Sequence, residues 1–138
     1  NDLPPYAIEL EITESLAMEE PKMVVHSLQA LKAIGLRIAI DDFGTGFSSL
    51  SQLRQLQVER LKIDRAFVNE AQAGSAGSSI ASMVVNLGRT LGMRVLAEGI
   101  ETEEQAQMLT ALGCHEGQGY LFARPMPSDA LEAWMRPA

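Results

Sequence analysis

Hydrophobic and polar residues alternate along short stretches of this chain and recur at helical spacing along longer ones. Tyr6–Thr13 alternates strictly, with aliphatic residues on one face and Glu9 and Glu11 on the other, which is typical of a strand. Pro21–Ile34 repeats its apolar positions every three or four residues and stops before Gly35, so it predicts a helix.

The same patterns predict five strands that alternate with five helices. The strands are expected at Tyr6–Thr13, Arg37–Ile40, Arg60–Ile63, Arg94–Ala97 and about Glu116–Leu121, and the helices at Pro21–Ile34, Ser48–Leu56, Ile80–Leu91, Glu103–Leu112 and Ser128–Met135, with Ser128 as the cap of the last. Asn69–Ser79 is rich in Gly, Ser and Ala and is expected to be a flexible connection.

Strands alternating with helices over short connections predict an α/β fold with a parallel sheet. Either a doubly wound open sheet or part of a TIM-type (β/α) barrel satisfies this pattern. A complete eight-stranded barrel takes about 250 residues. The 138 residues of this chain would therefore supply about five of the eight βα units.

Composition narrows the class of protein further. With 46% hydrophobic and 21% charged residues, the chain has the composition of an ordinary globular domain, and it holds no apolar run long enough to span a membrane. The net charge of −7 argues against a nucleic-acid polymer as partner. Cys114 is the only cysteine, which favours a reducing compartment such as the cytoplasm. Residues 1–6 resemble a linker that enters a strand.

Charged and polar residues follow each predicted strand at its carboxyl end, where parallel β/α folds gather their sites. They are Glu11 and Glu14, Asp41 and Asp42, Lys62 and Asp64, Glu98, and Gln118. Oxygen ligands of this kind suit Mg²⁺ or Mn²⁺. Two adjacent aspartates can bridge two metals about 4 Å apart, an arrangement that serves phosphoester hydrolysis.

These residues also have purely structural explanations. Glu14 can open a helix, Asp41 and Asp42 can form a turn, Lys62 can be an exposed edge-strand lysine, and Glu98 precedes a glycine. Their shared position at strand ends favours a site. There, a lysine can hold a water or neutralise phosphate charge, and Glu98 can act as general base.

Glu9 stands apart from this set. It lies two residues before Glu11 and therefore on the same face, one layer deeper. A buried glutamate needs a partner, and the sequence does not identify it.

Five ordered motifs resemble the EAL-domain family of cyclic-di-GMP phosphodiesterases. They are "ELEITES", "IDDFGTGFSSL", "LKIDRAFV", "LAEGIETEEQ" and "GQGYLFARPMP", and the resemblance runs from about Leu3 to Pro127. It implies a variant TIM barrel that hydrolyses the bacterial second messenger cyclic di-GMP to linear pGpG with Mg²⁺ or Mn²⁺.

The resemblance also implies a role for each residue of the motifs. Glu11 and Asp41 would be metal ligands, and Asp42 would contact a second metal. Lys62 would hold the catalytic water and Glu98 would act on that water.

Two further assignments follow from the same likeness. Gln118 would line the substrate pocket. Glu14 would brace the loop after Asp42, which the family links to dimerisation and activation.

The Glu-Ala-Leu signature that names the family is absent from the sequence, as is an asparagine strand. Residues 1–138 therefore resemble the C-terminal portion of a single EAL-type domain, with part of the metal shell missing and inactivity expected in isolation. An open barrel of this kind is expected to self-associate or form a homodimer. The residues also leave open an inactive cyclic-di-GMP receptor, an unrelated metal-dependent lyase and a regulatory scaffold.

Overall fold

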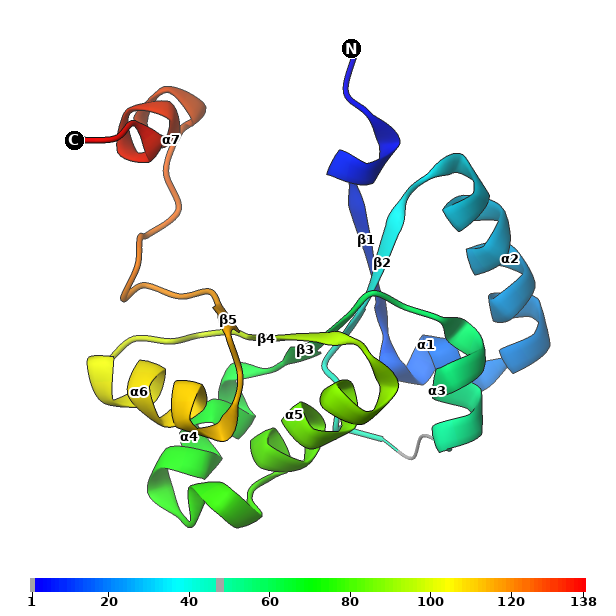
Figure 1. Cartoon of the computed structure of the whole chain (residues 1–138), viewed down its shortest axis with the longest axis horizontal. Coiled ribbons are helices and arrows are strands. Elements are labelled where there is room, and N and C mark those ends of the chain that lie inside the picture. Colours follow the sequence, from blue (N-terminus) through cyan, green and yellow to red (C-terminus); the bar gives the residue numbers. More distant parts are fainter. Residues whose placement is uncertain (1, 47–48) are drawn as a thin grey trace.

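Five parallel strands form one sheet in the computed structural model, which describes residues 2–46 and 49–138 (Figure 1). The strands are β1 (Glu9–Thr13), β2 (Arg37–Asp41), β3 (Arg60–Ile63), β4 (Arg94–Ala97) and β5 (Glu116–Gly117), paired in that order. In this register Ala39 of β2 pairs with Glu11 of β1 on one side and with Arg60 of β3 on the other.

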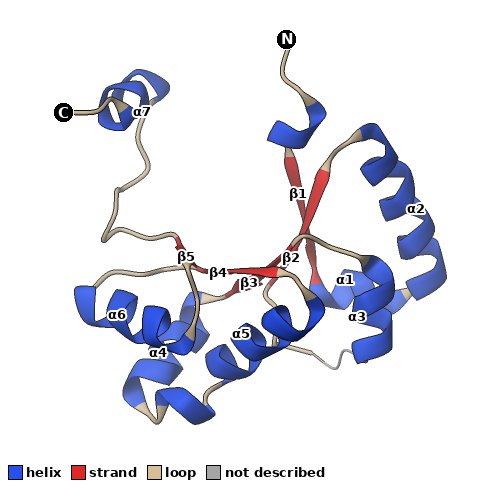
Figure 2. Cartoon of the chain, in the orientation of Figure 1, coloured by secondary structure: helices blue, strands red, loops and turns tan. Residues whose placement is uncertain are grey.

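The arrangement of the helices distinguishes a barrel from a doubly wound sheet. Sequential strand order with right-handed crossovers places every crossover helix on the same face, whereas a doubly wound sheet reverses its order and is covered on both faces. The strands here keep their sequential order, and the helices between them lie on the outer side of the curved sheet (Figure 2). The expected section of a (β/α) barrel is therefore confirmed.

Seven helices are present in the described part of the chain. They are α1 (Glu14–Glu19), α2 (Pro21–Ile34), α3 (Leu50–Leu56), α4 (Arg65–Ala73), α5 (Ile80–Leu91), α6 (Glu103–Leu112) and α7 (Ser128–Met135). The expected bounds of α2, α5 and α6 are confirmed. Each of these three helices ends at a glycine in the left-handed conformation, as at Gly35 with φ of 103°.

The prediction of a flexible connection at Asn69–Ser79 is wrong. Its first half belongs to α4, and a short 3-10 turn, η2 (Ala76–Ser78), follows. The side chain of Asp64 caps α4 by accepting the N–H of Ala66, and Val68 is fully buried. The Ala, Glu and Gln residues of this half are good helix formers, and packing of its apolar face stabilises the helix further, whereas the Gly and Ser residues follow the helix end.

Smaller corrections concern the ends of elements. β1 begins at Glu9 because Pro5–Ala7 forms a 3-10 turn, and β5 is only two residues long. α3 begins at Leu50 after its cap Ser49, whereas the predicted start at Ser48 lies outside the described residues. Pro127, not Ser128, is the cap residue of α7.

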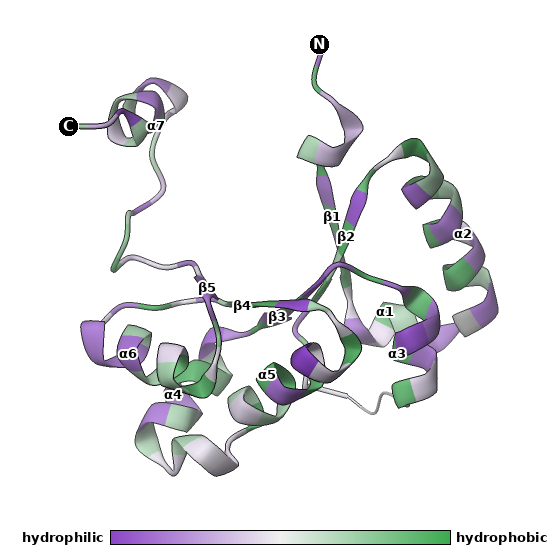
Figure 3. Cartoon of the chain, in the orientation of Figure 1, coloured by the Kyte–Doolittle hydropathy of each residue, from purple (hydrophilic) through white to green (hydrophobic). Residues whose placement is uncertain are grey.

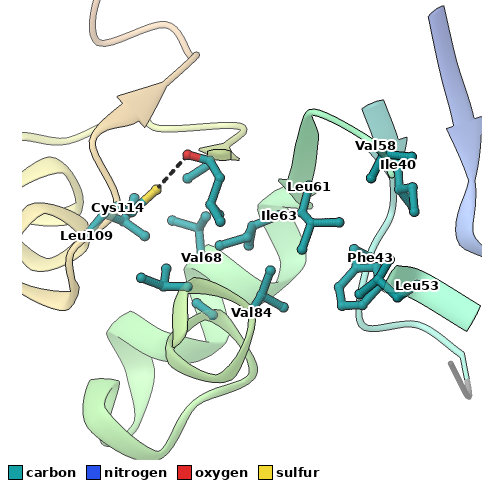
Figure 4. Close-up of a cluster of buried hydrophobic side chains, with 14 of the residues drawn as sticks. Ile40, Phe43, Leu53, Val58, Leu61, Ile63, Val68, Val84, Leu109 and Cys114 are labelled. Atoms are coloured by element: carbon teal, nitrogen blue, oxygen red, sulfur yellow. Dashed lines mark hydrogen bonds between the residues drawn. The ribbon is translucent and has the colours of Figure 1, made fainter. Parts of the chain in front are cut away.

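The hydrophobic core lies between the sheet and the outer helices. Figure 4 shows Leu61 and Ile63 of β3 among side chains from neighbouring elements, including Leu53 and Val84. These four side chains are fully excluded from solvent. Because the outward residues of the strands fill this core, the alternate residues face the concave side of the sheet.

Helix α7 lies apart from the rest of the structure, at the end of an extended segment (Figure 1). Hydrophobic and hydrophilic residues are both present along it (Figure 3), and Trp134 is 58% exposed. No helix among the described residues has the length and apolar character needed to cross a membrane.

Candidate active site at the carboxyl ends of the strands

Lys62 is the centre of the site. It lies on the middle strand β3 and is only 5% exposed, so it is not the exposed edge-strand lysine that the sequence left open. Its Nζ lies 2.5 Å from Oε1 of Glu11 on β1 and 2.6 Å from Oε1 of Glu98 after β4. Three sequence-predicted residues from three strands therefore meet at one point.

The two carboxylates determine the charge state of this lysine. Burial by itself would lower the pKa of Lys62, but the hydrogen bonds and negative charges of Glu11 and Glu98 outweigh it and raise that pKa above its ordinary value. An ammonium group has three donors, and two are directed at these glutamates. Lys62 is therefore a positively charged group, and among the described residues its third N–H remains available for another oxygen.

Asp41 and Asp42 form a tight turn at the end of β2. The N–H of Asp42 donates to Oδ1 of Asp41 at 2.9 Å, and Asp42 adopts φ of 52°, which is rare for a residue other than glycine. The N–H of Phe43 then donates to the carbonyl of Lys62 at 3.2 Å. This bond ties the paired aspartates to the strand that carries the lysine.

Asp64 is a member of this group that the sequence analysis did not assign a role. Burial and the negative charges of Asp41 and Asp64 raise the pKa of Asp42. A hydrogen bond that the protonated Asp42 carboxyl donates to Asp64 adds to this shift, and the positive charge of Lys62 opposes it. The position of Asp64 directly after β3, in "LKIDR", was the sequence signal that could have identified it as a member of the site. Three carboxylates thus lie near each other beside Lys62.

Glu14 lies beneath the loop that follows the aspartates. It is the first residue of α1 and is 2% exposed. Its Oε2 accepts hydrogen bonds from the N–H groups of Gly44, Thr45 and Gly46 at 2.9, 3.1 and 3.2 Å. The buried carboxylate of Glu14 thus holds the backbone of this loop and is not one of the carboxylates that pair with Lys62.

The loop that carries Glu98 is held from below by Gln105. This glutamine is 5% exposed, and its Oε1 accepts the N–H groups of Glu101 and Thr102. The N–H of Glu98 itself donates to the carbonyl of Ile63 at 2.9 Å. Glu98 therefore extends from a fixed backbone.

Gln118 lies just beyond β5. Its backbone is bonded to Ala97 and Ile100, while its side chain is exposed. It lines a cavity of about 400 Å³ together with Tyr120 and Arg124, whose guanidinium stacks 4.5 Å from the centre of the Tyr120 ring. A planar cation on an aromatic ring was not predicted, although both residues lie in "GQGYLFARP".

The structure also identifies the partner of Glu9. Nη1 of Arg60, at the start of β3, lies 2.6 Å from Oε1 and 2.8 Å from Oε2 of Glu9. The two residues are 51 positions apart in the sequence, and only the strand order brings them together.

The carboxylates offer the oxygen donors that a hard divalent cation prefers. Within residues 2–46 and 49–138, however, no group of three or more acidic, histidine or cysteine side chains is arranged to hold a metal ion. Glu11 and Glu98 are engaged by Lys62, and Asp41 by the turn. The donor chemistry fits such a cation, and the residues that the structure describes do not by themselves present a complete ligand set.

A section of a parallel barrel with an acidic rim around a buried lysine places this chain in the class of β/α-barrel proteins with a charged site at the carboxyl ends of the strands. Comparison with known proteins is more specific, because the EAL domain family matches residues 1–125. The chain belongs to the EAL domain family.

Individual relatives agree with this assignment. The chain is 48% identical over 133 residues to the bifunctional diguanylate cyclase/cyclic di-GMP phosphodiesterase MucR of Pseudomonas aeruginosa, with 96% of this chain and 19% of the relative covered. Among solved structures, the MucR phosphodiesterase in complex with cyclic di-GMP shares 49% identity and a TM-score of 0.88, with 94% of this chain and 52% of that chain covered.

A manganese/cyclic-di-GMP complex of BlrP1 from Klebsiella pneumoniae has 36% identity and a TM-score of 0.79, and the match covers 89% of this chain and 31% of that chain. The chain thus spans about a fifth of the length of MucR and about half of its solved phosphodiesterase chain.

Proposed function

We propose that this chain is the C-terminal portion of a cytoplasmic EAL-type domain that hydrolyses cyclic di-GMP to linear pGpG in bacterial signalling. The observation that carries the proposal is the buried Lys62 between Glu11 and Glu98, with Asp41 and Asp42 beside it at the same rim. The relatives named for this activity, MucR among them, support the choice of substrate.

The roles of the side chains follow from their charges. The third N–H of Lys62 is free of Glu11 and Glu98 and can donate to a water or to a phosphate oxygen, where it opposes developing negative charge. Glu98 can accept a proton from the attacking water. Water adds to phosphorus, one ribose oxygen leaves and takes up a proton, and the ring opens to the linear dinucleotide.

A divalent metal completes this proposal. Glu11, Asp41 and Asp42 would hold Mg²⁺ or Mn²⁺, in a two-metal site completed by ligands from outside this chain. When bound, such ions neutralise phosphate charge and make water a stronger nucleophile.

Gln118 is proposed to contact the substrate. It lies beside a cavity of about 400 Å³ that also exposes the stacked pair of Tyr120 and Arg124. Aromatic rings and guanidinium planes can stack on nucleobases, which suits a guanine dinucleotide.

The test is Mn²⁺-dependent turnover of cyclic di-GMP by the protein that contains this chain. Metal contacts supply several kcal/mol, so Asp41→Asn is expected to lower kcat by about 100-fold or more. Asp129→Asn, an exposed acid on α7, is the matched control and is expected to leave turnover unchanged. Tight binding without turnover by the wild type would make the protein a receptor, and neither binding nor turnover would refute the proposal.

We also propose that the chain self-associates as a homodimer. Within the described sheet, β1 and β5 pair on one side only, and unpaired strand edges invite pairing with another chain. Light scattering that finds only a stable 15.0 kDa monomer would contradict this.

A further inference from the structure

A second charged layer lies beneath the Lys62 site, on the same concave face of the sheet. It consists of Glu9, Arg60 and Glu116 at the starts of β1, β3 and β5. Nη1 of Arg60 binds both oxygens of Glu9, and Nη2 lies 2.9 Å from Oε2 of Glu116. The exposed fractions of these side chains are 18% for Arg60 and 21% for each glutamate, so the layer is largely withdrawn from water.

This layer repeats the geometry of the site above it. In both layers a cation on β3 lies between two glutamates, one of which comes from β1. Arg60 and Lys62 are two residues apart, and so are Glu9 and Glu11, so each pair shares one face of its strand. Successive positions on one face of a strand lie about 6–7 Å apart, so the two layers are neighbours along each strand.

Strand β2 permits both layers to form. Glu9 and Glu11 lie on β1 and their cations lie on β3, so each contact passes over β2. The residue of β2 that pairs with both Glu11 and Arg60 is Ala39, which is fully buried. Its single methyl group leaves room for the charged side chains to meet across the strand.

The guanidinium of Arg60 is committed to the two carboxylates. Its Nε is buried and has no hydrogen-bond partner within the described part of the chain, so only Glu9 and Glu116 orient it. Arg60 thus holds Glu9, and it shares Glu116 with Arg94, whose Nε also pairs with that glutamate.

We propose that Arg60 is a positioning residue for Lys62. By neutralising Glu9, it keeps the Lys62 ammonium directed at Glu11 and Glu98. Without Arg60, Glu9 becomes an uncompensated carboxylate one layer below, and it draws the flexible lysine side chain away from the reacting phosphate. The catalytic consequence rests on the function proposed above, whereas the position of Lys62 does not.

The experiment compares variants of the protein that contains this chain. Misplacement of a catalytic group by about 1 Å costs about 100-fold, so Arg60→Met is expected to lower kcat by about 10- to 100-fold, with KM for cyclic di-GMP within about threefold of wild type. Adding Glu9→Gln removes the competing charge, so the double variant is expected to recover most of this loss. Arg60→Lys keeps the charge and is expected to retain more activity than Arg60→Met. Arg89→Met, at an exposed arginine on α5, is the matched control.

A second readout is independent of turnover. In ¹⁵N-lysine-labelled protein, an ammonium held by two carboxylates exchanges slowly and gives a resolved NMR signal, which Lys62→Met identifies. This signal is expected to disappear in Arg60→Met and to return in the double variant. If wild-type protein does not hydrolyse cyclic di-GMP, the proposed function fails and this signal still decides the role of Arg60.

Two results would overturn the inference. One is an Arg60→Met protein with wild-type kcat and an unchanged Lys62 signal. The other is a double variant, folded by circular dichroism, that is no better than Arg60→Met, because a purely structural arginine is not replaced by removing a glutamate. If Arg60→Met does not fold, Arg60→Lys decides in its place: loss of both activity and signal despite the retained charge would contradict charge compensation.

Discussion

Replacement of Glu14 by glutamine tests how the loop after the paired aspartates is held. One oxygen of this buried carboxylate accepts the N–H groups of Gly44, Thr45 and Gly46 at 2.9 to 3.2 Å. Hydrogen bonds to a charged group contribute about 1.5–3 kcal/mol each and neutral ones about 0.5–1.5 kcal/mol. Each of the three bonds is expected to lose about 1 kcal/mol in Glu14→Gln. Because the losses are not fully additive, the loop is expected to be destabilised by about 2–3 kcal/mol.

Hydrogen exchange of the three loop amides measures this loss directly. A destabilisation of about 2–3 kcal/mol corresponds to exchange that is about 30- to 150-fold faster. Glu19→Gln, at an exposed acid near the end of α1, is the matched control and is expected to leave loop exchange unchanged. If exchange in Glu14→Gln stays within twofold of wild type, Glu14 does not hold the loop and the reasoning fails.

Three other predictions concern single positions. Lys62→Met is expected to lower kcat for cyclic di-GMP by about 100- to 1,000-fold, and steady-state activity within threefold of wild type would contradict its role. Gly44→Ala places a Cβ on a residue with φ of 103° and 2.8 Å from Cγ2 of Ile80. It is expected to lower the free energy of unfolding, measured by urea titration, by about 1–3 kcal/mol. The control Gly77→Ala, whose Cβ would have no atom within 4 Å, is expected to leave that free energy unchanged. Burial raises the pKa of the Cys114 thiol above its ordinary value of 9.0. The contribution of the protonated thiol to the free energy of unfolding is therefore complete below pH 9.0 and is lost as pH rises from there through the pKa of the folded protein. Cys114→Ala is then expected to flatten the loss of stability above pH 9.0, and an equally steep loss in both proteins would refute this.

The sequence predicted the elements that carry strong local signals. α5 and α6 have regular apolar spacing, a capping residue and a terminal glycine, and their predicted bounds are correct. α4 was missed although Ala, Arg, Glu and Gln give it a good helix propensity. Its C-terminal half runs directly into the Gly- and Ser-rich residues 74–79, and the composition of the whole stretch was read as one connection. β5 was overestimated because "GQGYLF" has strand composition but turns away after Gly117.

The site shows the same division between local and distant information. The positions of Glu11, Lys62 and Glu98 at strand ends predicted that they converge, since parallel strands deliver their carboxyl ends to one rim. The sequence did not indicate which cation pairs with which carboxylate, because this pairing depends on strand order and on small residues such as Ala39. The pairing of Glu9 with Arg60 is a contact of this kind, set by strand order and not by local sequence.

The detached position of α7 has a practical consequence for spectroscopy. Trp134 is the only tryptophan of the chain, and it lies on this helix with 58% of its surface exposed. Its emission therefore reports the surroundings of α7 and is insensitive to the packing between the sheet and the outer helices. A blue shift would signal that something has covered α7, while melting of the barrel section would have to be followed by circular dichroism.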